Sequence, residues 1–583
     1  MKTLPNDKEK HSSGDPLTFP PLLHEVPMAK SQRKIAVRLR RLEPREITGE
    51  MSLYFDAETS PMPVVERLAS EKSTGNYAAD IRKLLKSSGV YALASLALPL
   101  VTLVLSPFLT HALSRTDYGA LAVMTTAISL LAGVTQFGLG TAFFRAYNYD
   151  YELQEDKLRV LSIVIILLAL SSVPLALGVA LLAPWLATFL VGSASYSGSV
   201  RLLGLVVLLQ NLTVPGFAWL RAEGRAAFYA VLSVTNLLVN LAMTVILIRW
   251  LQLGVNGALL AMALGYGFVV ICTLPLALLR AGLRFRWDVS WSLLSFGLPM
   301  VGNLVSIWVL QLADRYLLSH LGSLAETASY TVAYSLGGVL GALVLSPFSL
   351  AWPTAMFAIA KRDDAASVFR QIFRWYSLFL LFATAGLMLA SVCVLYLFFP
   401  GSYYVAVPVI PIVALSIMFF GIYNYFTVGI SIRRKTWLAV VLTALAALTN
   451  VGLNLWLIPS YGAIGAAFAT LVGYLLLAIG GYIVNQWLYP IPFEIGLFGL
   501  ALFTGVLLYG GAALLLQLQK VGNVGAFIIF VYLFCLYAGL LAYMGKYPPL
   551  WLSRERSSLR PEREKPAQPV AATKLDTSGR QPD

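Results

Sequence analysis

The stretch GVNGALLAMALGY at residues 254–266 recurs as GAIGAAFATLVGY at residues 462–474, with glycine, alanine and tyrosine at matching places. The offset between the two copies is 208 residues throughout. Shortly before each copy, a Thr-Asn-x-x-x-Asn-Leu pattern at residues 235–241 returns at residues 449–455, at an offset of 214. The shared order and the nearly constant offset indicate that the chain contains an internal duplication.

The composition of the whole chain is that of a membrane protein. Of its 583 residues, 58% are hydrophobic and only 12% are charged, whereas an ordinary soluble domain has about 25% charged residues. The mean hydropathy is +0.73. Because so few charges cannot cover a water-exposed surface, the sequence predicts a polytopic membrane protein. It excludes a soluble enzyme, a fibrous protein and a disordered chain.

Fourteen apolar runs are long enough to cross a bilayer, whose hydrocarbon core of about 30 Å needs about 20 residues of helix. Every backbone polar group in hydrocarbon must be bonded internally, so we expect these runs to be helices and the fold to be all-α. The expected spans are residues 90–112, 119–140, 160–182, 200–219, 228–248, 255–279, 292–314, 330–356, 375–399, 404–428, 437–458, 463–485, 495–517 and 524–544.

The duplication covers six of these helices in each copy. Since six is an even number, both copies enter the membrane in the same direction. A pseudo-twofold axis along the membrane normal should relate them, with a cavity between them. We therefore expect one six-helix lobe at residues 81–286 and a second at residues 287–486. Two additional C-terminal helices, within residues 487–545, follow the second lobe.

The positive charges predict the orientation. With the N-terminus in the cytoplasm, the inner loops hold 15 Lys and Arg residues and the outer loops and helix ends hold 5, in agreement with the positive-inside rule. Residues 1–80, with a basic patch at 30–45, and residues 546–583 are then disordered cytoplasmic tails. The patch could contact anionic membrane lipids or simply be solvated. Nothing else supports binding to nucleic acid, and none is expected.

No motif for enzymatic chemistry or ATP hydrolysis is present. The chain has no Gly-x-x-x-x-Gly-Lys-Ser/Thr loop, with which many ATPases hold phosphates. Its three cysteines lie inside apolar runs and its four histidines lack ligand spacing, so neither a metal site nor another cofactor is expected. We expect a non-enzymatic protein driven by an H⁺ or Na⁺ gradient, by the membrane potential or by substrate supply.

The neighbouring Asp314 and Arg315 are the most unusual charged residues of the membrane region. They lie at the outer end of the seventh expected span, where exposure to lipid would be costly, so they should face protein or a wet cavity. Two explanations fit this pair equally well. It could contact the substrate or a coupling ion, or it could be a structural ion pair. Asn303 and Gln311 share a face of the same span, and Arg145 ends the second. For Asn303 and Gln311, the alternative to substrate binding is a hydrogen bond between helices. For Arg145, the alternative is a side chain that extends from the helix end to the membrane surface.

Several short segments give the chain a family resemblance. They are Leu113-Ser114-Arg115-Thr116-Asp117-Tyr118-Gly119, Gly138-Leu139-Gly140 with Phe144-Arg145, Gly297-Leu298-Pro299, and Asp314-Arg315-Tyr316 with Tyr330. In this order they resemble the oligosaccharide (polysaccharide-unit) flippases of the multidrug/oligosaccharidyl-lipid/polysaccharide (MOP) exporter superfamily. The resemblance extends from about Ile81 to about Val484.

The resemblance implies alternating access by fourteen helices in the bacterial cytoplasmic (inner) membrane. The implied cargo is a polyprenyl-diphosphate-linked oligosaccharide, carried from the cytoplasmic to the outer leaflet for cell-surface polysaccharide such as lipopolysaccharide. The resemblance also places Asp117, Asp314 and Arg315 at positions where relatives carry functionally important charged residues. The first span departs from the pattern, because it has no basic residue at mid-membrane for the diphosphate.

Two other classes of protein are alternatives. A multidrug or small-molecule exporter of the same fold would need an acidic residue deep in a lobe, and the sequence offers none there. A membrane glycosyltransferase or polymerase would need acidic residues in an outer loop, or a long outer loop rich in Arg and His. The expected outer loops are short, and the first offers only Asp117.

Overall fold

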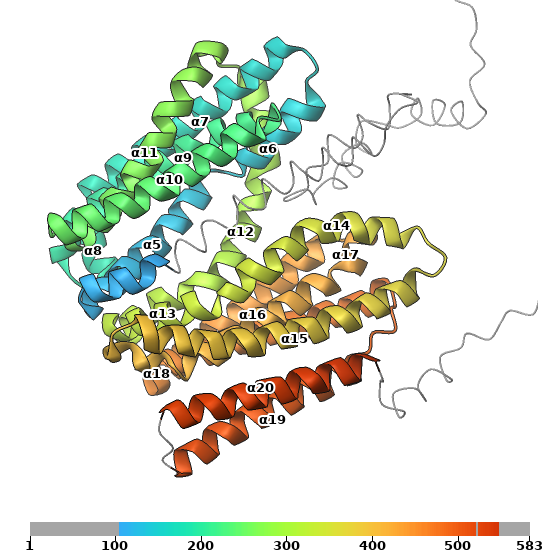
Figure 1. Ribbon diagram of the computed structural model, residues 1–583. Coiled ribbons are helices and arrows are strands. Elements are labelled where there is room, and N and C mark those ends of the chain that lie inside the picture. Colours follow the sequence, from blue (N-terminus) through green and yellow to red (C-terminus); the bar gives the residue numbers. More distant parts are fainter. Residues whose placement is uncertain (1–103, 520–522, 547–583) are drawn as a thin grey trace, which may run out of the picture. The chain divides into compact units, whose positions relative to one another are not determined.

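The computed structural model describes residues 104–519 and 523–546, all within the unit Asp56–Asp583 (Figure 1). Every element in these residues is helical, so the all-α prediction is confirmed for the part of the chain that the structure describes. The expected tail at 1–80 with its basic patch, almost all of the tail at 546–583 and most of the span at 90–112 lie outside the described residues.

A first group of helices, the N-terminal lobe, is coloured blue to green in Figure 1. A helix at residues 104–112 precedes it. Its members are α5 (Arg115–Thr135), α6 (Leu139–Arg145), α7 (Gln154–Leu181), α8 (Ala183–Val191), α9 (Ser197–Ala222), α10 (Ala226–Val245) and α11 (Gly254–Ala281), with short turns η2 (Ala146–Asp150), η3 (Ala194–Tyr196) and η4 (Ile246–Trp250). α9 packs between α7 and α11, and α10 lies against α11.

A second group, the C-terminal lobe, is yellow to orange in Figure 1. Its members are α13 (Leu324–Gly337), α14 (Ser346–Ala360), α15 (Ala365–Phe398), α16 (Val409–Phe426), α17 (Val428–Ile432) and α18 (Trp437–Leu488), with turns η5 (Gly341–Leu345) and η6 (Gly401–Ala406). α16 packs against α13, α15 and α18. Its buried aromatic side chains, such as Tyr425 and Phe426, stack with rings from α15 and from the segment before α19.

Helix α12 (Trp287–Leu321) packs with both lobes. It is bent by 50° between the parts Trp287–Pro299 and Leu304–Leu321, next to a proline that removes one backbone hydrogen bond. The first part buries Val289 and Leu293 in a core formed by α6, α7, α9 and α11. The second part packs mainly on α18, and also on α5 and α13. In Figure 1, α12 accordingly runs from one group of helices to the other.

The bend of α12 lies against a break between α5 and α6. At this break Gly138 has a left-handed φ of +66°. A Cβ atom built on Gly138 would lie 2.6 Å from the carbonyl oxygen of Gly297. The backbones of the two segments are therefore in direct contact, which only glycine at these positions allows.

The number of membrane helices agrees with a multi-pass protein. The described residues hold eleven helices long and apolar enough to cross a membrane, or twelve if the two parts of α12 count as one span. One of the eleven is α18, whose 52 residues, at about 1.5 Å each, exceed twice the hydrocarbon thickness of about 30 Å. α18 is broken at Gly462, where φ is +53°. The total of fourteen stays a prediction, because most of the first expected span is not described.

The two copies of the duplicated motif begin with the same backbone conformation. Gly254, the first residue of α11, has a φ of +56°, and its counterpart Gly462 within α18 has a φ of +53°. Both glycines allow a sharp turn that an L-residue with a side chain would strain. Each thus separates two consecutive membrane helices at the equivalent place in its lobe.

The third glycine of each copy also has an equivalent neighbour. A Cβ on Gly265 would lie 2.6 Å from the side-chain oxygen of Asn236, and a Cβ on Gly473 would lie 3.3 Å from the Cβ of Asn450. In each lobe this glycine therefore packs against the first asparagine of the Thr-Asn pattern. The internal duplication predicted from the sequence is present in the structure.

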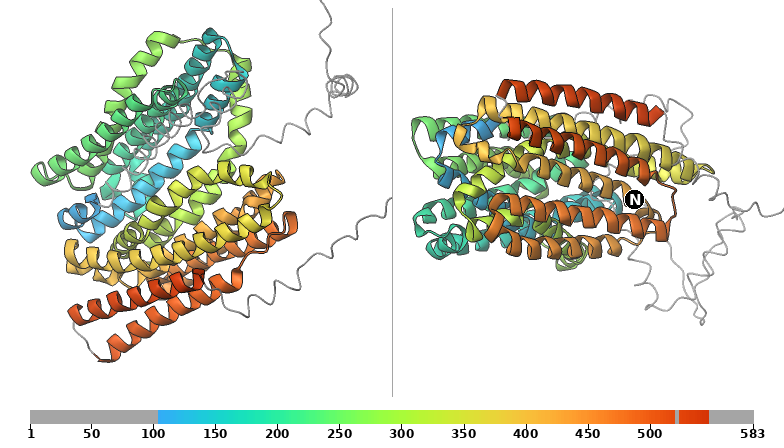
Figure 2. Two further views of the ribbon diagram at one scale, coloured as in Figure 1. Left: turned by 45° about the vertical axis from the view of Figure 1, so that its right-hand side comes forward. Right: turned by 90° about the horizontal axis from the view of Figure 1, so that it is seen from below.

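Two further helices follow the duplicated part, α19 (Ile495–Gln519) and α20 (Asn523–Lys546). They pack on each other and on α15, and both views of Figure 2 show them, in red, beside the second group. Phe382 of α15 and Phe534 of α20 contribute to this contact with ring centres 5.3 Å apart.

Replacing Gly138 with alanine should destabilise the protein more than the same change at Gly192. Both residues have a left-handed φ, which costs an alanine roughly 1 kcal/mol. Only the new Cβ at Gly138 would also meet a backbone, since nothing lies within 4 Å of the one at Gly192. Thermal melting of the purified variants in detergent measures the difference. Equal melting temperatures would contradict the close backbone contact with α12.

Candidate functional site

The two lobes meet where α5 and α13 begin. The side chain of Ser114 caps α5 by accepting a hydrogen bond from the backbone N–H of Asp117, and Ser323 caps α13 in the same way from Glu326. The two caps are 209 residues apart, close to the offset of the duplication. The contact therefore joins equivalent helix ends of the two lobes.

Arg115 is the main polar contact between these helix ends. Its Nη2 atom donates to the hydroxyl of Ser329 at 2.7 Å and to the carbonyl oxygen of Ala325 at 3.2 Å. Its guanidinium carbon lies 5.7 Å from the ring centre of Tyr403 in η6. One side chain of the N-terminal lobe thus holds two elements of the C-terminal lobe.

The backbones also touch at this place. A Cβ on Gly119 would overlap with the carbonyl oxygen of Leu324. Beside this contact, Tyr118 packs edge-on against Tyr403, with ring centres 6.2 Å apart. We call the contact formed by Arg115, Gly119, Leu324, Ser329 and Tyr403 the lobe junction. At the lobe junction the two lobes are in direct contact.

At and beside the lobe junction lie buried polar atoms that have no hydrogen-bond partner among the residues the structure describes. They are Nε of Arg115, Oε2 of Glu326 and the hydroxyl of Tyr403. Burial raises the pKa of Tyr403, and the neighbouring Tyr118 adds to this effect while Arg115 opposes it. Since a buried unpaired polar group costs about 1–3 kcal/mol, this junction is less stable than a fully bonded one. Such a contact is suited to opening.

A second polar site lies deeper in the C-terminal lobe, around Asp314 of α12. This carboxylate is fully buried. It accepts a short hydrogen bond from the hydroxyl of Tyr330 in α13. It also accepts hydrogen bonds from the backbone N–H of Arg315 at 2.8 Å and from the hydroxyl of Thr470 in α18 at 3.5 Å. Three helices therefore supply donors to one acid.

Arg315 balances the charge of this acid. Its Nη1 atom lies 3.4 Å from the Asp314 carboxylate and donates to the carbonyl oxygen of Gln311 at 3.0 Å. Its guanidinium also stacks over the ring of Tyr334, 4.3 Å from the ring centre. Only 7% of Arg315 is exposed. A buried charge needs such a partner, because removing one member of a buried pair typically costs 3–5 kcal/mol.

The polar site continues from Thr470 along α18. Asn450 donates to the hydroxyl of Thr470 at 3.4 Å, and Asn454 donates to the side-chain oxygen of Asn450 at 3.1 Å. Within residues 104–519 and 523–546, the side-chain oxygen of Asn454 has no hydrogen-bond partner. We call Asp314, Tyr330, Thr470, Asn450 and Asn454 the acid cluster. It offers a row of oxygen atoms that could accept a proton or a small cation.

The N-terminal lobe lacks an equivalent acid. In that lobe the corresponding pair of helices is joined by a hydrogen bond of 3.0 Å between the hydroxyls of Ser106 and Tyr118, where the C-terminal lobe uses Asp314 and Tyr330. At the place of Thr470, the duplication puts Met262. The two lobes therefore share a fold but differ in charge at this position.

Of the residues expected to bind substrate, the structure brings together Asp314, Arg315 and Gln311. Asn303 is in α12, but its side chain lies outside the part that the structure describes. Asp117 lies near the lobe junction, where it accepts hydrogen bonds of 2.8 Å from the hydroxyls of Ser114 and Tyr196. It holds η3 to the start of α5.

Arg145 lies in the N-terminal lobe, at the end of α6. Its guanidinium is 4.7 Å from the ring centre of Phe296 in α12 and 3.6 Å from the carboxylate of Asp150. Its side chain is 42% exposed. Nearby, burial and a hydrogen bond to Glu223 raise the pKa of Tyr147. Arg145 is thus a partly exposed cation, separate from the acid cluster.

The sequence analysis did not assign a role to Arg115, Tyr330 or Thr470 at these sites. For Arg115 a signal was available, because Ser114 and Asp117 have the spacing of a helix N-cap, which indicates a helix that begins at Arg115. No comparable signal joins Tyr330 and Thr470 to Asp314, since the contacts cross from one helix to another over long distances in sequence.

The same arrangement of membrane helices in two lobes occurs in known membrane transporters. The chain is similar to the lipid II flippase MurJ in an inward closed conformation, with a TM-score of 0.62 and 14% identity over 79% of this chain and 98% of that one. It is also similar to a multidrug resistance MATE family transporter of the MOP superfamily in an inward-facing conformation. There the TM-score is 0.50, with 16% identity over 68% of this chain and 97% of the other. The fold is that of a MOP-type transporter.

The sequence comparison names the family. Residues 108–408 match the model of a family described as polysaccharide biosynthesis protein, and this match covers more than half of the chain. The chain belongs to this family, which confirms the resemblance noted above. No curated protein matches the sequence.

Replacing Gly119 with valine should hold the lobe junction apart, because the new side chain would overlap with the backbone of Leu324. Fluorescent labels at the exposed Leu253 and Tyr461, which precede the equivalent glycines of the two lobes, report the separation. We expect a longer distance in Gly119→Val. Gly178→Val is the matched control, since nothing lies within 4 Å of a Cβ there. An unchanged distance in both variants would refute the proposed closure at Gly119.

Proposed function

We propose that this protein is a flippase that moves a lipid-linked oligosaccharide from the cytoplasmic to the outer leaflet of the bacterial inner membrane. The cargo would be polyprenyl-diphosphate-linked and would serve the synthesis of cell-surface polysaccharide. The observation that carries the proposal is the family match over residues 108–408, together with the MOP fold of the described helices. The neighbour that is a lipid II flippase covers more of the chain than the multidrug transporter does.

The cargo explains why two lobes around a polar space are needed. An oligosaccharide carries on the order of ten hydroxyl groups, each of which costs roughly 2–7 kcal/mol to transfer into hydrocarbon without hydrogen bonds. A charged diphosphate costs far more. Spontaneous movement of the head group is therefore negligible, whereas a polar passage between lobes can replace its hydrogen bonds and leave the polyprenyl tail in the lipid.

The orientation that we propose places both termini in the cytoplasm. It is supported by the excess of Lys and Arg in the expected inner loops. The lobe junction then faces the outside, where it closes the passage in the arrangement described here. Alternating access would consist of opening this junction while the opposite ends of the lobes approach one another.

We propose different roles for the charged residues. Arg145 is partly exposed and paired only at 3.6 Å with Asp150, so it can exchange this partner for the diphosphate of the cargo. Asn303 remains a proposed sugar contact, and Asp117 helps to hold the outer end. Asp314 and Arg315 are buried in the closed arrangement, which favours a role in coupling over direct contact with the sugar.

The coupling proposal is that the acid cluster takes up H⁺ or Na⁺. It is supported by the burial of Asp314 among hydroxyl and amide groups and by the neutral pair that replaces it in the N-terminal lobe. Binding a cation would change the net charge beside Arg315. The hydrogen bond from Tyr330 would then weaken, which loosens α13 where it begins at the lobe junction.

A multidrug exporter of the same fold is the alternative, and the similarity to the MATE transporter supports it. The acid that such an exporter requires could be Asp314. The two functions differ in cargo, because an exporter would act on soluble compounds with no lipid tail. An enzymatic function is less well supported, since the similar folds belong to transporters.

Deleting the gene should cause complete lipid-linked oligosaccharide units to accumulate on the cytoplasmic leaflet, because assembly would continue without translocation. Protection of the sugar from an added glycosidase in sealed right-side-out vesicles measures the leaflet. Incomplete units would instead indicate an enzyme of assembly. Normal units on the outer leaflet, with greater sensitivity to drugs, would favour the multidrug exporter.

Replacing Asp314 with asparagine should abolish the dependence of transport on the coupling ion. Asparagine has nearly the same size, but it leaves Arg315 without its charge partner, so the melting temperature of the variant in detergent is measured alongside to show that it is folded. In proteoliposomes, transport by the unchanged protein should respond to either a pH gradient or a Na⁺ gradient, which identifies the ion. Asp364→Asn is the control, because Asp364 is an exposed acid outside the acid cluster and the lobe junction. Ion dependence that survives in Asp314→Asn would refute the coupling proposal.

A further inference from the structure

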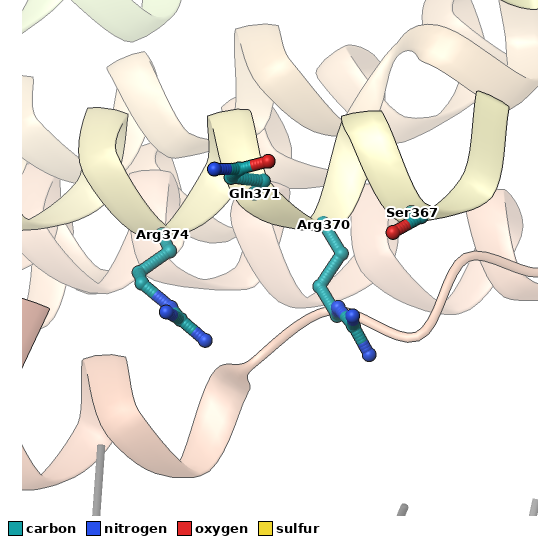
Figure 3. Close-up of a pocket in the computed structure, with 4 residues that line it drawn as sticks. All are labelled: Ser367, Arg370, Gln371 and Arg374. Atoms are coloured by element: carbon teal, nitrogen blue, oxygen red, sulfur yellow. The ribbon is translucent and has the colours of Figure 1, made fainter. Parts of the chain in front are cut away.

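A basic pocket lies on α15, away from the lobe junction and the acid cluster. It has a volume of about 180 Å³ and is lined by Ser367, Arg370, Gln371 and Arg374. These residues occupy three successive turns near the start of the helix. Figure 3 shows both guanidinium groups extending from the same side of α15. The walls are thus formed by side chains that can donate hydrogen bonds.

One acid contacts the two arginines. Glu494, which precedes α19, forms a two-pronged ion pair with Arg374 through Nε and Nη2. It approaches Arg370 only to 3.9 Å, and the side chain of Arg370 is 30% exposed. The pair of arginines and this single carboxylate leave one positive charge. Arg370 is the side chain that can give this charge to another anion.

The donors of the basic pocket are open to the solvent. Ser367 and Gln371 are exposed, and the side chain of Arg370 is 30% exposed. An anion with several oxygen atoms would bond to more than one of them at once. A phosphate group has this shape and charge, and guanidinium groups bind it in a forked geometry.

The length of α15 places the pocket at the depth of lipid head groups. Its 34 residues rise by about 1.5 Å each, so the helix exceeds a hydrocarbon core of about 30 Å by about 20 Å. The first turns therefore extend beyond the core. Trp375, directly after the pocket, is exposed, as is typical of tryptophan at the boundary between water and lipid.

An exposed apolar stripe leads from the pocket toward the middle of the membrane. Trp375, Phe379 and Phe382 follow Gln371 at intervals of four, four and three residues, so they share one face of α15. All three are exposed, and Phe382 also contacts Phe534 of α20. A molecule with a phosphate head and acyl chains would fit both parts, whereas a soluble anion would use the pocket alone.

We propose that the basic pocket binds the phosphate of an anionic phospholipid whose acyl chains lie along Trp375, Phe379 and Phe382. The lipid would sit where α15 meets the segment before α19, and so would strengthen the attachment of the two additional helices to the C-terminal lobe. This proposal does not depend on the identity of the transported cargo.

The test uses the full-length protein in detergent, with native mass spectrometry to measure bound phosphatidylglycerol and phosphatidylcholine of identical acyl chains. In Arg370→Gln we expect phosphatidylglycerol to bind about five-fold more weakly, as for the loss of one cation near an anionic lipid, with no change for phosphatidylcholine. Arg362→Gln is the matched control. Arg362 lies just before α15 and is exposed, but is already paired with Asp364 at 2.8 Å.

A second variant and two competitors make the outcome decisive. Ser367→Ala should also weaken phosphatidylglycerol binding, and the melting temperature without added lipid should be unchanged in both pocket variants. Equal lipid binding by Arg370→Gln and Arg362→Gln would overturn the proposal. Displacement of the lipid by inorganic phosphate at equal concentration would indicate a site for soluble anions instead. A polyprenyl diphosphate could instead bind more tightly than phosphatidylglycerol and lose this tighter binding in Arg370→Gln. That result would overturn the proposal and indicate that the pocket binds the transported cargo.

Discussion

The structure depends on one helix that packs in both lobes. The first part of α12 fills the core of the N-terminal lobe and the second part lies on α18. In a membrane the hydrophobic effect does not hold helices together, so close packing and hydrogen bonds must do so. The contact between Gly138 and Gly297 supplies close packing at the bend, and Asp314 supplies hydrogen bonds beyond it. The lobe junction between α5 and α13 adds a second, direct contact between the lobes.

The duplication supplies a symmetric frame, but the two lobes differ in charge at one equivalent position. Ser106 and Tyr118 form an uncharged pair in one lobe, whereas Asp314 and Tyr330 form a charged one in the other. A buried carboxylate is expensive unless it is bonded and its charge is balanced, and Arg315 meets that requirement here. The buried carboxylate and its balancing arginine are therefore a feature of the C-terminal lobe that the equivalent position of the N-terminal lobe does not share.

The sequence allowed the frame to be predicted because it depends on local backbone requirements. Gly254 and Gly462 are needed for a left-handed turn, and Gly265 and Gly473 are needed for close packing, so both copies keep them. Composition and the length of the apolar runs were sufficient for the membrane class and the all-α fold. The family followed from short segments in a shared order.

The details of the site could not be predicted in the same way. The hydrogen bond from Tyr330 to Asp314 and the one from Arg115 to Ser329 connect different helices, and hydropathy does not specify which helix faces meet. The break at Gly138 was also hard to foresee, because the apolar run continues through it. The break within α18 at Gly462 agrees with the two separate spans expected at 437–458 and 463–485. Arg145 and Asp314 looked alike as charges at span ends, but burial separates them.

Because α12 is bent, a small rotation at the bend would produce a large displacement at the end of the helix. The part Leu304–Leu321 is an arm of about 27 Å at about 1.5 Å per residue. Rotating it by about 10° about the bend would therefore displace its far end by about 5 Å, roughly one helical turn. Pro299 removes one of the hydrogen bonds that would resist such a rotation. A small rearrangement between the lobes at this pivot is amplified at the far tip of the arm, near which the two repeats touch.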